Sequence, residues 1–118
     1  MIKAYQLYAD PEGNSRVQEG IIAEKVFTKV VSLHFKETPP GGIYDWHPAP
    51  DTQYVLSLTG TLEFTTSTGE IFVLEPGEVL IATDTTGQGH KWRMLGDAPW
   101  KRAYVVFERG TEINFQPV

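Results

Sequence analysis

The chain has 118 residues, no cysteine and a formal net charge of −5 at pH 7. Without cysteine it can form neither disulfides nor thiolate metal sites, and its acidity argues against a nucleic-acid partner, which needs clustered lysine and arginine. No apolar run approaches the roughly 18 residues of a membrane span, and the N-terminus lacks the apolar run of a secretion signal. We therefore expect a cytoplasmic protein with no membrane partner, whose partner is a small molecule or another protein.

Strand signals recur along the chain, and helix signals are almost absent. The runs rich in Val, Ile, Phe, Tyr and Thr are, in chain order, residues 2–7, 25–36, 53–58, 61–66, 70–74, 78–83, 89–95 and 101–108. Short strands at this spacing, separated by turn residues, are typical of an all-β sandwich or barrel.

The connections contain residues that end strands or form turns. Residues 8–20 are predicted to be an ordered loop within an N-terminal arm, residues 1–24. Gly60 and Gly69 can supply the positive φ of tight hairpins, so residues 53–83 are predicted to form a meander. No second domain or internal repeat is found, and residues 1–118 are expected to form a single domain.

The segment GIYDWHPAPDTQYVLSLTG, residues 42–60, is the most informative part of the chain. Side chains two residues apart share a face of an extended strand. His47, Ala49, Asp51 and Gln53 would therefore lie on one side of a regular strand, although the two prolines between them argue against that regularity.

This segment resembles the first cupin motif, in which a glycine precedes a His-x-His pair, a glutamate and a closing glycine. His47, Gln53 and Gly60 stand at the first histidine, the glutamate and the closing glycine. The turn Pro76-Gly77, the run after it and His90 resemble the second motif, with a longer loop. The resemblance covers about residues 30–107 and is to small single-domain cupins. It implies an antiparallel β-barrel of the jelly-roll or double-stranded β-helix type, commonly a homodimer.

The resemblance also implies a metal site on His47, Gln53 and His90 for one divalent transition metal, which would be Fe, Mn, Ni, Zn or Cu. Two usual ligands are altered, because Ala49 replaces the second histidine and Gln53 replaces the glutamate. A neutral amide binds transition metals weakly, so a metal-free pocket is the alternative. His34 would complete a set of three histidines if it faced the pocket; otherwise it is a half-exposed strand residue.

Without a metal, His47 and His90 could exchange protons with a substrate beside Gln53, because imidazole titrates close to neutral pH. Asp45 could orient one histidine or cap the turn.

Further candidates for ligand binding flank these residues. Trp92 and Met94 share the strand face of His90, and Tyr54 and His34 are also candidates, with core packing as the alternative for the aromatic side chains. Trp46 is predicted to face away from His47. An indole in the pocket favours an apolar or aromatic substrate.

Two functions from different classes are consistent with these features. The first is an enzyme acting on a small organic molecule, either by metal-dependent chemistry such as oxygenation or by isomerisation, cyclisation or elimination. The second is a non-catalytic module or sensor that holds a metabolite in the same pocket, since one fold hosts many functions.

Overall fold

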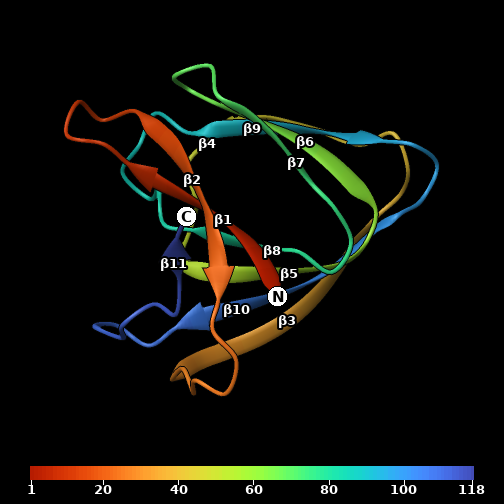
Figure 1. Ribbon diagram of the computed structural model, residues 1–118. Helices are drawn as coiled ribbons and strands as arrows, with labels where there is room; N and C mark the ends of the chain where they lie inside the picture. Colours follow the sequence, from red (N-terminus) through yellow and green to blue (C-terminus); the bar gives the residue numbers. More distant parts are fainter.

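The computed structural model describes all residues, 1–118, and the chain folds into eleven β-strands without a helix (Figure 1). The strands are β1 Ile2–Ala9, β2 Ser15–Ile22, β3 Val30–Thr38, β4 Ile43–His47, β5 Gln53–Thr59, β6 Thr61–Thr66, β7 Ile71–Leu74, β8 Val79–Ala82, β9 His90–Leu95, β10 Trp100–Phe107 and β11 Gln116–Pro117. The predicted all-β class is confirmed. The chain has no helix of the length and apolar character that a membrane crossing requires.

The strands form two sheets, one above the other in Figure 1. The larger has the order β11-β2-β1-β8-β5-β10-β3, and the smaller has the order β4-β9-β6-β7. Strand pairs are antiparallel, with the exception of β1 and β8, which run parallel. No strand pairing joins one sheet to the other.

Alternating burial along the strands builds the core between the sheets. In β5 and β6 every second side chain is buried, which is the pattern of strands with one face turned inward. Buried side chains from both sheets, among them Val55, Phe64, Leu80 and Trp100, form one cluster. Burying each large apolar side chain contributes about 1.5–3 kcal/mol, so this cluster holds together two sheets that share no hydrogen-bonded strands.

The middle of the chain forms a folded hairpin, not the meander predicted over residues 53–83. β5 pairs with β8 and β6 with β7, while the consecutive strands β5 and β6 lie in different sheets. The chain changes sheet at Gly60, whose φ is 90° and whose backbone approaches the carbonyl of Pro99 too closely for any side chain. The prediction was wrong because Gly60 bends the chain between sheets instead of closing a hairpin.

A second folded hairpin encloses the first. β3 pairs with β10 in the larger sheet, and β4 pairs with β9 in the smaller one. β10 also pairs with β5, and β9 with β6, so the outer hairpin lies directly against the inner one.

The N-terminal residues form a hairpin instead of the loop predicted over residues 8–20. β2, Ser15–Ile22, pairs along its whole length with β1 and extends the larger sheet. Its sequence, SRVQEGII, mixes polar and apolar residues without a regular alternation, and this explains why it gave no strand signal.

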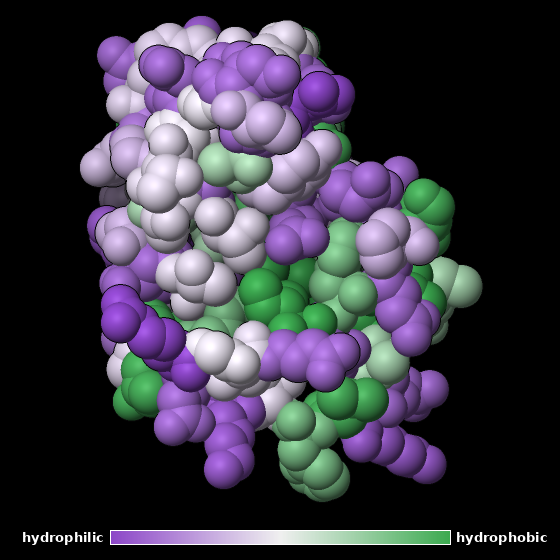
Figure 2. All heavy atoms as spheres, turned by 90° about the vertical axis from the view of Figure 1, so that its left-hand side faces the viewer, coloured by the Kyte–Doolittle hydropathy of each residue, from purple (hydrophilic) through white to green (hydrophobic).

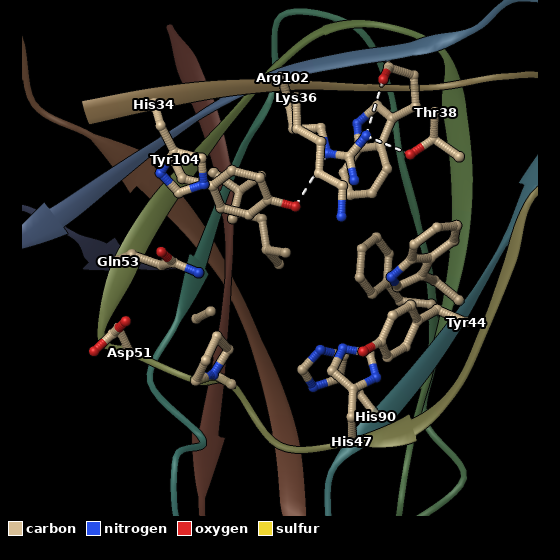
Figure 3. A pocket seen from close by; sticks show the side chains of 18 of the residues that line it. His34, Lys36, Thr38, Tyr44, His47, Asp51, Gln53, His90, Arg102 and Tyr104 are labelled. Atoms are coloured by element: carbon tan, nitrogen blue, oxygen red, sulfur yellow. Dashed lines mark hydrogen bonds between the residues drawn. The ribbon is translucent and has the colours of Figure 1, made fainter. Parts of the chain in front are cut away.

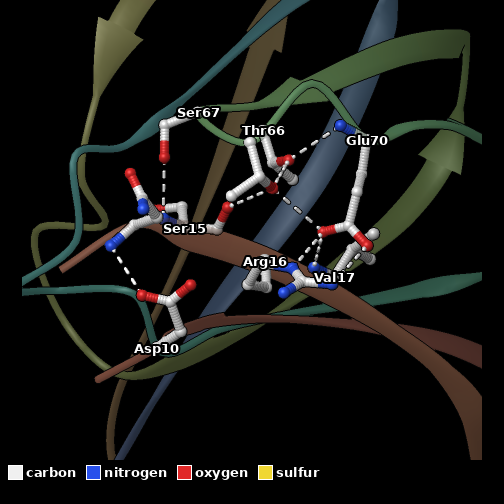
Figure 4. Close-up of polar contacts among 9 residues, drawn as sticks. Asp10, Ser15, Arg16, Val17, Thr66, Ser67 and Glu70 are labelled. Atoms are coloured by element: carbon white, nitrogen blue, oxygen red, sulfur yellow. Dashed lines mark hydrogen bonds and ion pairs between the residues drawn. The ribbon is translucent and has the colours of Figure 1, made fainter. Parts of the chain in front are cut away.

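Polar contacts fasten this hairpin to the turn between β6 and β7 (Figure 4). The main-chain N–H of Ser15 donates to the hydroxyl of Ser67 at 2.8 Å, and Arg16 forms an ion pair with Glu70 at 3.0 Å. Glu70 also accepts a hydrogen bond from the main-chain N–H of Val17. These contacts hold Ser15 in a fixed place at the junction of the two sheets.

A smaller cluster covers the outer face of the larger sheet, where Ile113 and Phe115 of the C-terminal segment pack against Ile81 and Phe107. Figure 2 views the molecule from the side of the β1–β2 turn. Its upper part is mostly hydrophilic, and hydrophobic side chains gather in a hollow in its lower half.

Candidate functional site

A cavity of about 570 Å³ lies between the two sheets (Figure 3). This volume is in the range of sites that bind small molecules. His47, Ala49, Gln53 and His90 all line it, so the positions singled out by the motifs meet in one space. Residues 48–52 form no strand, yet Asp51 also faces the cavity. The four residues 47, 49, 51 and 53 thus line one cavity, but they do not share one side of a regular strand, because a loop separates His47 from Gln53 and places the two on different walls.

His90 is the first residue of β9 and is held by a buried carboxylate. Its side chain is 4% exposed, and its Nδ1 lies 2.8 Å from Oδ2 of Asp84, which is fully buried. The same Oδ2 accepts a hydrogen bond of 2.7 Å from the hydroxyl of Ser15, which in turn accepts one from the N–H of Gly89. Since a carboxylate can only accept, Nδ1 of His90 carries a proton and Nε2 is left for the cavity.

Asp84 is ionised at neutral pH despite its burial. Burial alone would raise the pKa of this carboxyl, but the hydrogen bond and charge of His90, with the hydroxyl of Ser15, hold the pKa below its ordinary value. Its other oxygen, Oδ1, has no hydrogen-bond partner in the protein. The negative charge of Asp84 is therefore stabilised through Oδ2, the oxygen that contacts His90 and Ser15.

His47 is the last residue of β4 and stands directly opposite His90 across the β4–β9 pair. The ring centroids are 4.4 Å apart. Its Nδ1 lies 2.7 Å from the main-chain carbonyl oxygen of Asp45, so this nitrogen also carries a proton and Nε2 is free. The main-chain carbonyl of Asp45 thus orients His47, whereas the carboxylate of Asp45 contacts neither histidine and accepts a hydrogen bond of 2.8 Å from the main-chain N–H of Trp46, as the capping alternative predicted.

Burial lowers the pKa of His47, and the neighbouring charge of His90 lowers it further. The approach of the two strands depends on Gly89, whose φ is 103° and whose backbone packs against the carbonyl of His47. A side chain at this position would meet the main chain of His47. The glycine before His90 is thus what lets the two imidazoles lie together.

Gln53 and Asp51 occupy the opposite side of the cavity from the histidine pair (Figure 3). Gln53 is 5% exposed, and none of the protein's side-chain hydrogen bonds involves its amide. It can therefore donate to or accept from a ligand. Ala49 is buried where the resemblance expects a second metal-binding histidine, and it contributes only a methyl group.

His34 faces the cavity but does not join the other two histidines. It projects from β3, and its ring stacks on Tyr104 with centroids 4.8 Å apart. Figure 3 shows it across the cavity from His47 and His90. No three His, Asp or Glu side chains come together in a metal-binding group. The predicted set of three histidines is therefore not assembled.

The other predicted ligand-binding residues divide between the cavity and the core. Trp92 lines the cavity beside His90 and also packs against the cluster between the sheets, so it meets both predicted alternatives. Met94 belongs to the cluster between the sheets and does not line the cavity. Tyr54 lies on the opposite face of β5 from Gln53, where its ring packs on Phe107 and its hydroxyl donates to the carbonyl of Asn114. Adjacent strand residues point to opposite faces, so Tyr54 could not share the cavity with Gln53.

Trp46 faces outward, as predicted. It is 47% exposed, and the amine of Lys91 lies 4.8 Å from its ring centroid on the surface. Its indole therefore takes no part in the cavity beside its chain neighbour His47.

Sequence reasoning missed the cavity's cationic end and the support of His90. Arg102, Lys36 and Thr38 line the upper end of the cavity in Figure 3. On β3 and β10 these polar residues alternate with residues that point outward, so the sequence does show that they share one strand face. It does not show which of the two faces is turned inward. Asp84 and Ser15 were missed because their contact joins residues far apart in the chain.

No protein-family model matches this chain, and a search of curated proteins finds no match either.

Proposed function

We propose that this protein is an enzyme that moves a proton within a small organic molecule, with His47 as the base and His90 as the acid. One observation carries the proposal. Both imidazoles have Nδ1 bonded to an oxygen acceptor, which leaves the Nε2 atoms of two adjacent rings in one cavity without a hydrogen-bond partner in the protein. A histidine held in one tautomer, with its second nitrogen free, is arranged for proton transfer.

The different surroundings of the two histidines assign their roles. His47 is kept neutral by burial and by the charge of His90, so its Nε2 has a lone pair that can take a proton. His90 is backed by the ionised carboxylate of Asp84, which stabilises an imidazolium. Neighbouring groups whose environments favour different protonation states are the usual basis for such assignments.

The chemistry balances without a redox partner. Nε2 of His47 removes a proton from a C–H or O–H bond of the substrate, and Nε2 of His90 delivers a proton to a carbonyl oxygen, a carbon or a leaving group. Isomerisation, cyclisation and elimination all have this form, and each returns the histidine pair to its starting state after a proton passes between the two or through water. Gln53 would bind the polar group of the substrate from the opposite side.

The proposal places the chain among the small cupins. The nested pairs β3–β10, β4–β9, β5–β8 and β6–β7, divided between two sheets, are the arrangement expected of a jelly-roll or double-stranded β-helix. The motif positions 47, 49, 53 and 90, inferred from that resemblance, line one cavity. Both observations support a cupin barrel, and neither depends on the reaction.

A divalent metal held by His47 and His90 is the second candidate. Histidines that bind metals usually donate their other N–H to a carboxylate or a main-chain carbonyl, as both do here. The donor set is nevertheless short. Catalytic sites for such metals usually have three or more protein ligands, whereas Asp84 is turned to Nδ1 of His90 and Gln53 lies across the cavity. The side chains near the histidine pair therefore fall short of the usual ligand set for such a metal.

The test is a search for hydrogen exchange in deuterated water. The protein, stripped of metal by a chelator and checked by elemental analysis, is incubated with a panel of small ketones, enols and hydroxy acids, and NMR follows deuterium uptake and product formation. We expect exchange that is lost in His47→Ala and in His90→Ala. Activity that needs added metal would support the second candidate, and tight binding of a compound returned without exchange would support a non-catalytic module.

A further inference from the structure

Arg102 is a buried cation without a counter-ion. Its side chain projects from β10 into the cavity and is 2% exposed. Nε donates to the hydroxyl of Tyr104 at 3.0 Å, and Nη1 donates to the hydroxyl of Thr38 at 2.7 Å and to the carbonyl of Trp100 at 3.1 Å. All these acceptors are neutral. None of the protein's ion pairs includes Arg102.

The guanidinium is held firmly in place. Its central carbon lies 3.8 Å from the ring centroid of Trp100 and 5.6 Å from that of Tyr104. Three hydrogen bonds and two aromatic rings fix its position, but they leave Nη2 without a hydrogen-bond partner in the protein. The guanidinium is therefore preorganised, and its Nη2 remains available to donate to a ligand.

A second cation lies opposite the first. Lys36 is the direct partner of Arg102 across the β3–β10 pair, and it lines the same cavity. Like charges at opposed strand positions repel and destabilise a sheet. Asp51 is the one carboxylate that lines the cavity, and Figure 3 shows it on another wall, beside Gln53. Burying a charge is costly unless an opposite charge compensates it.

We propose that the cavity binds the carboxylate of a small organic acid between Arg102 and Lys36. The free Nη2 of Arg102 and the amine of Lys36 supply two cationic donors, which suit the two oxygens of one carboxylate. The ligand's charge would relieve the repulsion between the two side chains. This inference deepens the proposed function and rests on it, because it takes the occupant to be the substrate.

The other side chains that line the cavity indicate the chemistry of the rest of the ligand. A chain of aromatic contacts links the cationic end to the histidine pair: Arg102 lies on Trp100, whose neighbours in turn are Trp92 and Tyr44, and Tyr44 contacts His47. Phe64 lies beside His90. A carboxylate held at Arg102 would therefore place an apolar or aromatic body against these rings and present the far end of the molecule to His47 and His90. The substrate class is an organic acid whose reacting group is separated from its carboxylate by an apolar body.

The experiment compares acids with their neutral amides. The probes are benzoate, phenylacetate and 3-phenylpropionate, each paired with its amide, titrated at constant ionic strength while NMR follows the indole resonances of Trp92 and Trp100. We expect at least one acid to bind about tenfold or more tightly than its amide. R102M should abolish this preference, and K36M should reduce it. The control K91M removes a surface lysine outside the cavity and should change nothing.

Three results would overturn the inference. They are equal affinity for every acid and its amide, native preference in R102M, and binding of sulfate as tight as that of the best acid. Should R102M not fold, K36M decides, since Lys36 is exposed and its loss leaves the core intact; an undiminished preference there would also refute the proposal. His47→Ala and His90→Ala should keep the preference for acids, so a failure of the proton-transfer chemistry is distinguishable from a failure of the carboxylate site.

Discussion

Replacing Asp84 by asparagine separates the charge of this residue from its shape. Asp84 is fully buried and accepts hydrogen bonds of 2.8 Å from His90 and 2.7 Å from Ser15. Asparagine keeps an oxygen that can accept both bonds. A hydrogen bond to a charged group contributes about 1.5–3 kcal/mol and a neutral one about 1 kcal/mol, so Asp84→Asn should lower the free energy of unfolding by about 1–3 kcal/mol. The corresponding decrease in Tm is roughly 5–10 °C.

The loss of stability in Asp84→Asn should depend on pH. The pKa of Asp84 is lowered in the folded protein, so its contribution is present above the ordinary carboxyl pKa and is lost as the pH falls through the folded-state pKa. The difference between native protein and Asp84→Asn should therefore be full near pH 7 and shrink below about pH 4. Urea unfolding across this range measures it.

Asp84→Asn should also reduce kcat by about 10²-fold or more, because His90 loses the charge that stabilises its imidazolium. Asp97→Asn is the matched control, since Asp97 is exposed and makes no side-chain hydrogen bond. Equal stability of native protein and Asp84→Asn near pH 7, with an unchanged pH profile, would refute the reasoning.

Because burial lowers the pKa of His47, the acid limb of kcat/KM should lie below pH 6.5, and an acid limb above that value would contradict the assignment of His47 as the base. Gln53→Glu should raise affinity for divalent metals in isothermal titration if the histidine pair binds a metal, and should leave it unchanged if the pair only moves protons. Gly89→Ala should lower the free energy of unfolding, measured in urea, by about 1–3 kcal/mol and should separate the two histidines, because Gly89 has a φ of 103° and packs against the main chain of His47. Native stability in this variant would show that the approach of the strands does not depend on this glycine. The expected homodimer should bury the edge strand β3, where Phe35 is 69% exposed, so Phe35→Glu should give a monomer in light scattering while Thr111→Glu should not.

The histidine pair was predictable only through the resemblance to the two cupin motifs, because the pairing of β4 with β9 that brings His47 to His90 joins distant parts of the chain. The parity of β9 placed Trp92 on the same strand face as His90, and this inference needs only local sequence. The strand runs from residue 53 onward were also found within a residue or two, since their alternation is strong. These features depend on neighbours in the chain, and a single sequence contains that information.

What could not be predicted depends on contacts between distant residues. Ser15 reaches Asp84 only because β2 joins the larger sheet, and nothing in SRVQEGII indicates that it does. Arg102 and Lys36 become a pair only through the register of β3 and β10. The error at Tyr54 is of another kind and was avoidable, because adjacent strand residues point to opposite faces and Gln53 already takes the inward one.

The most direct test of the central claim is the tautomer and titration of the three histidines, His34, His47 and His90, in long-range ¹H–¹⁵N NMR spectra. A His34→Gln variant assigns the third set of signals. We expect neutral His47 and neutral His90 both to carry their proton on Nδ1, and the pKa of His47 to lie below the ordinary imidazole value of 6.5 because of its burial. A proton on Nε2 of either neutral ring, or a pKa of His47 above 6.5, would contradict this assignment.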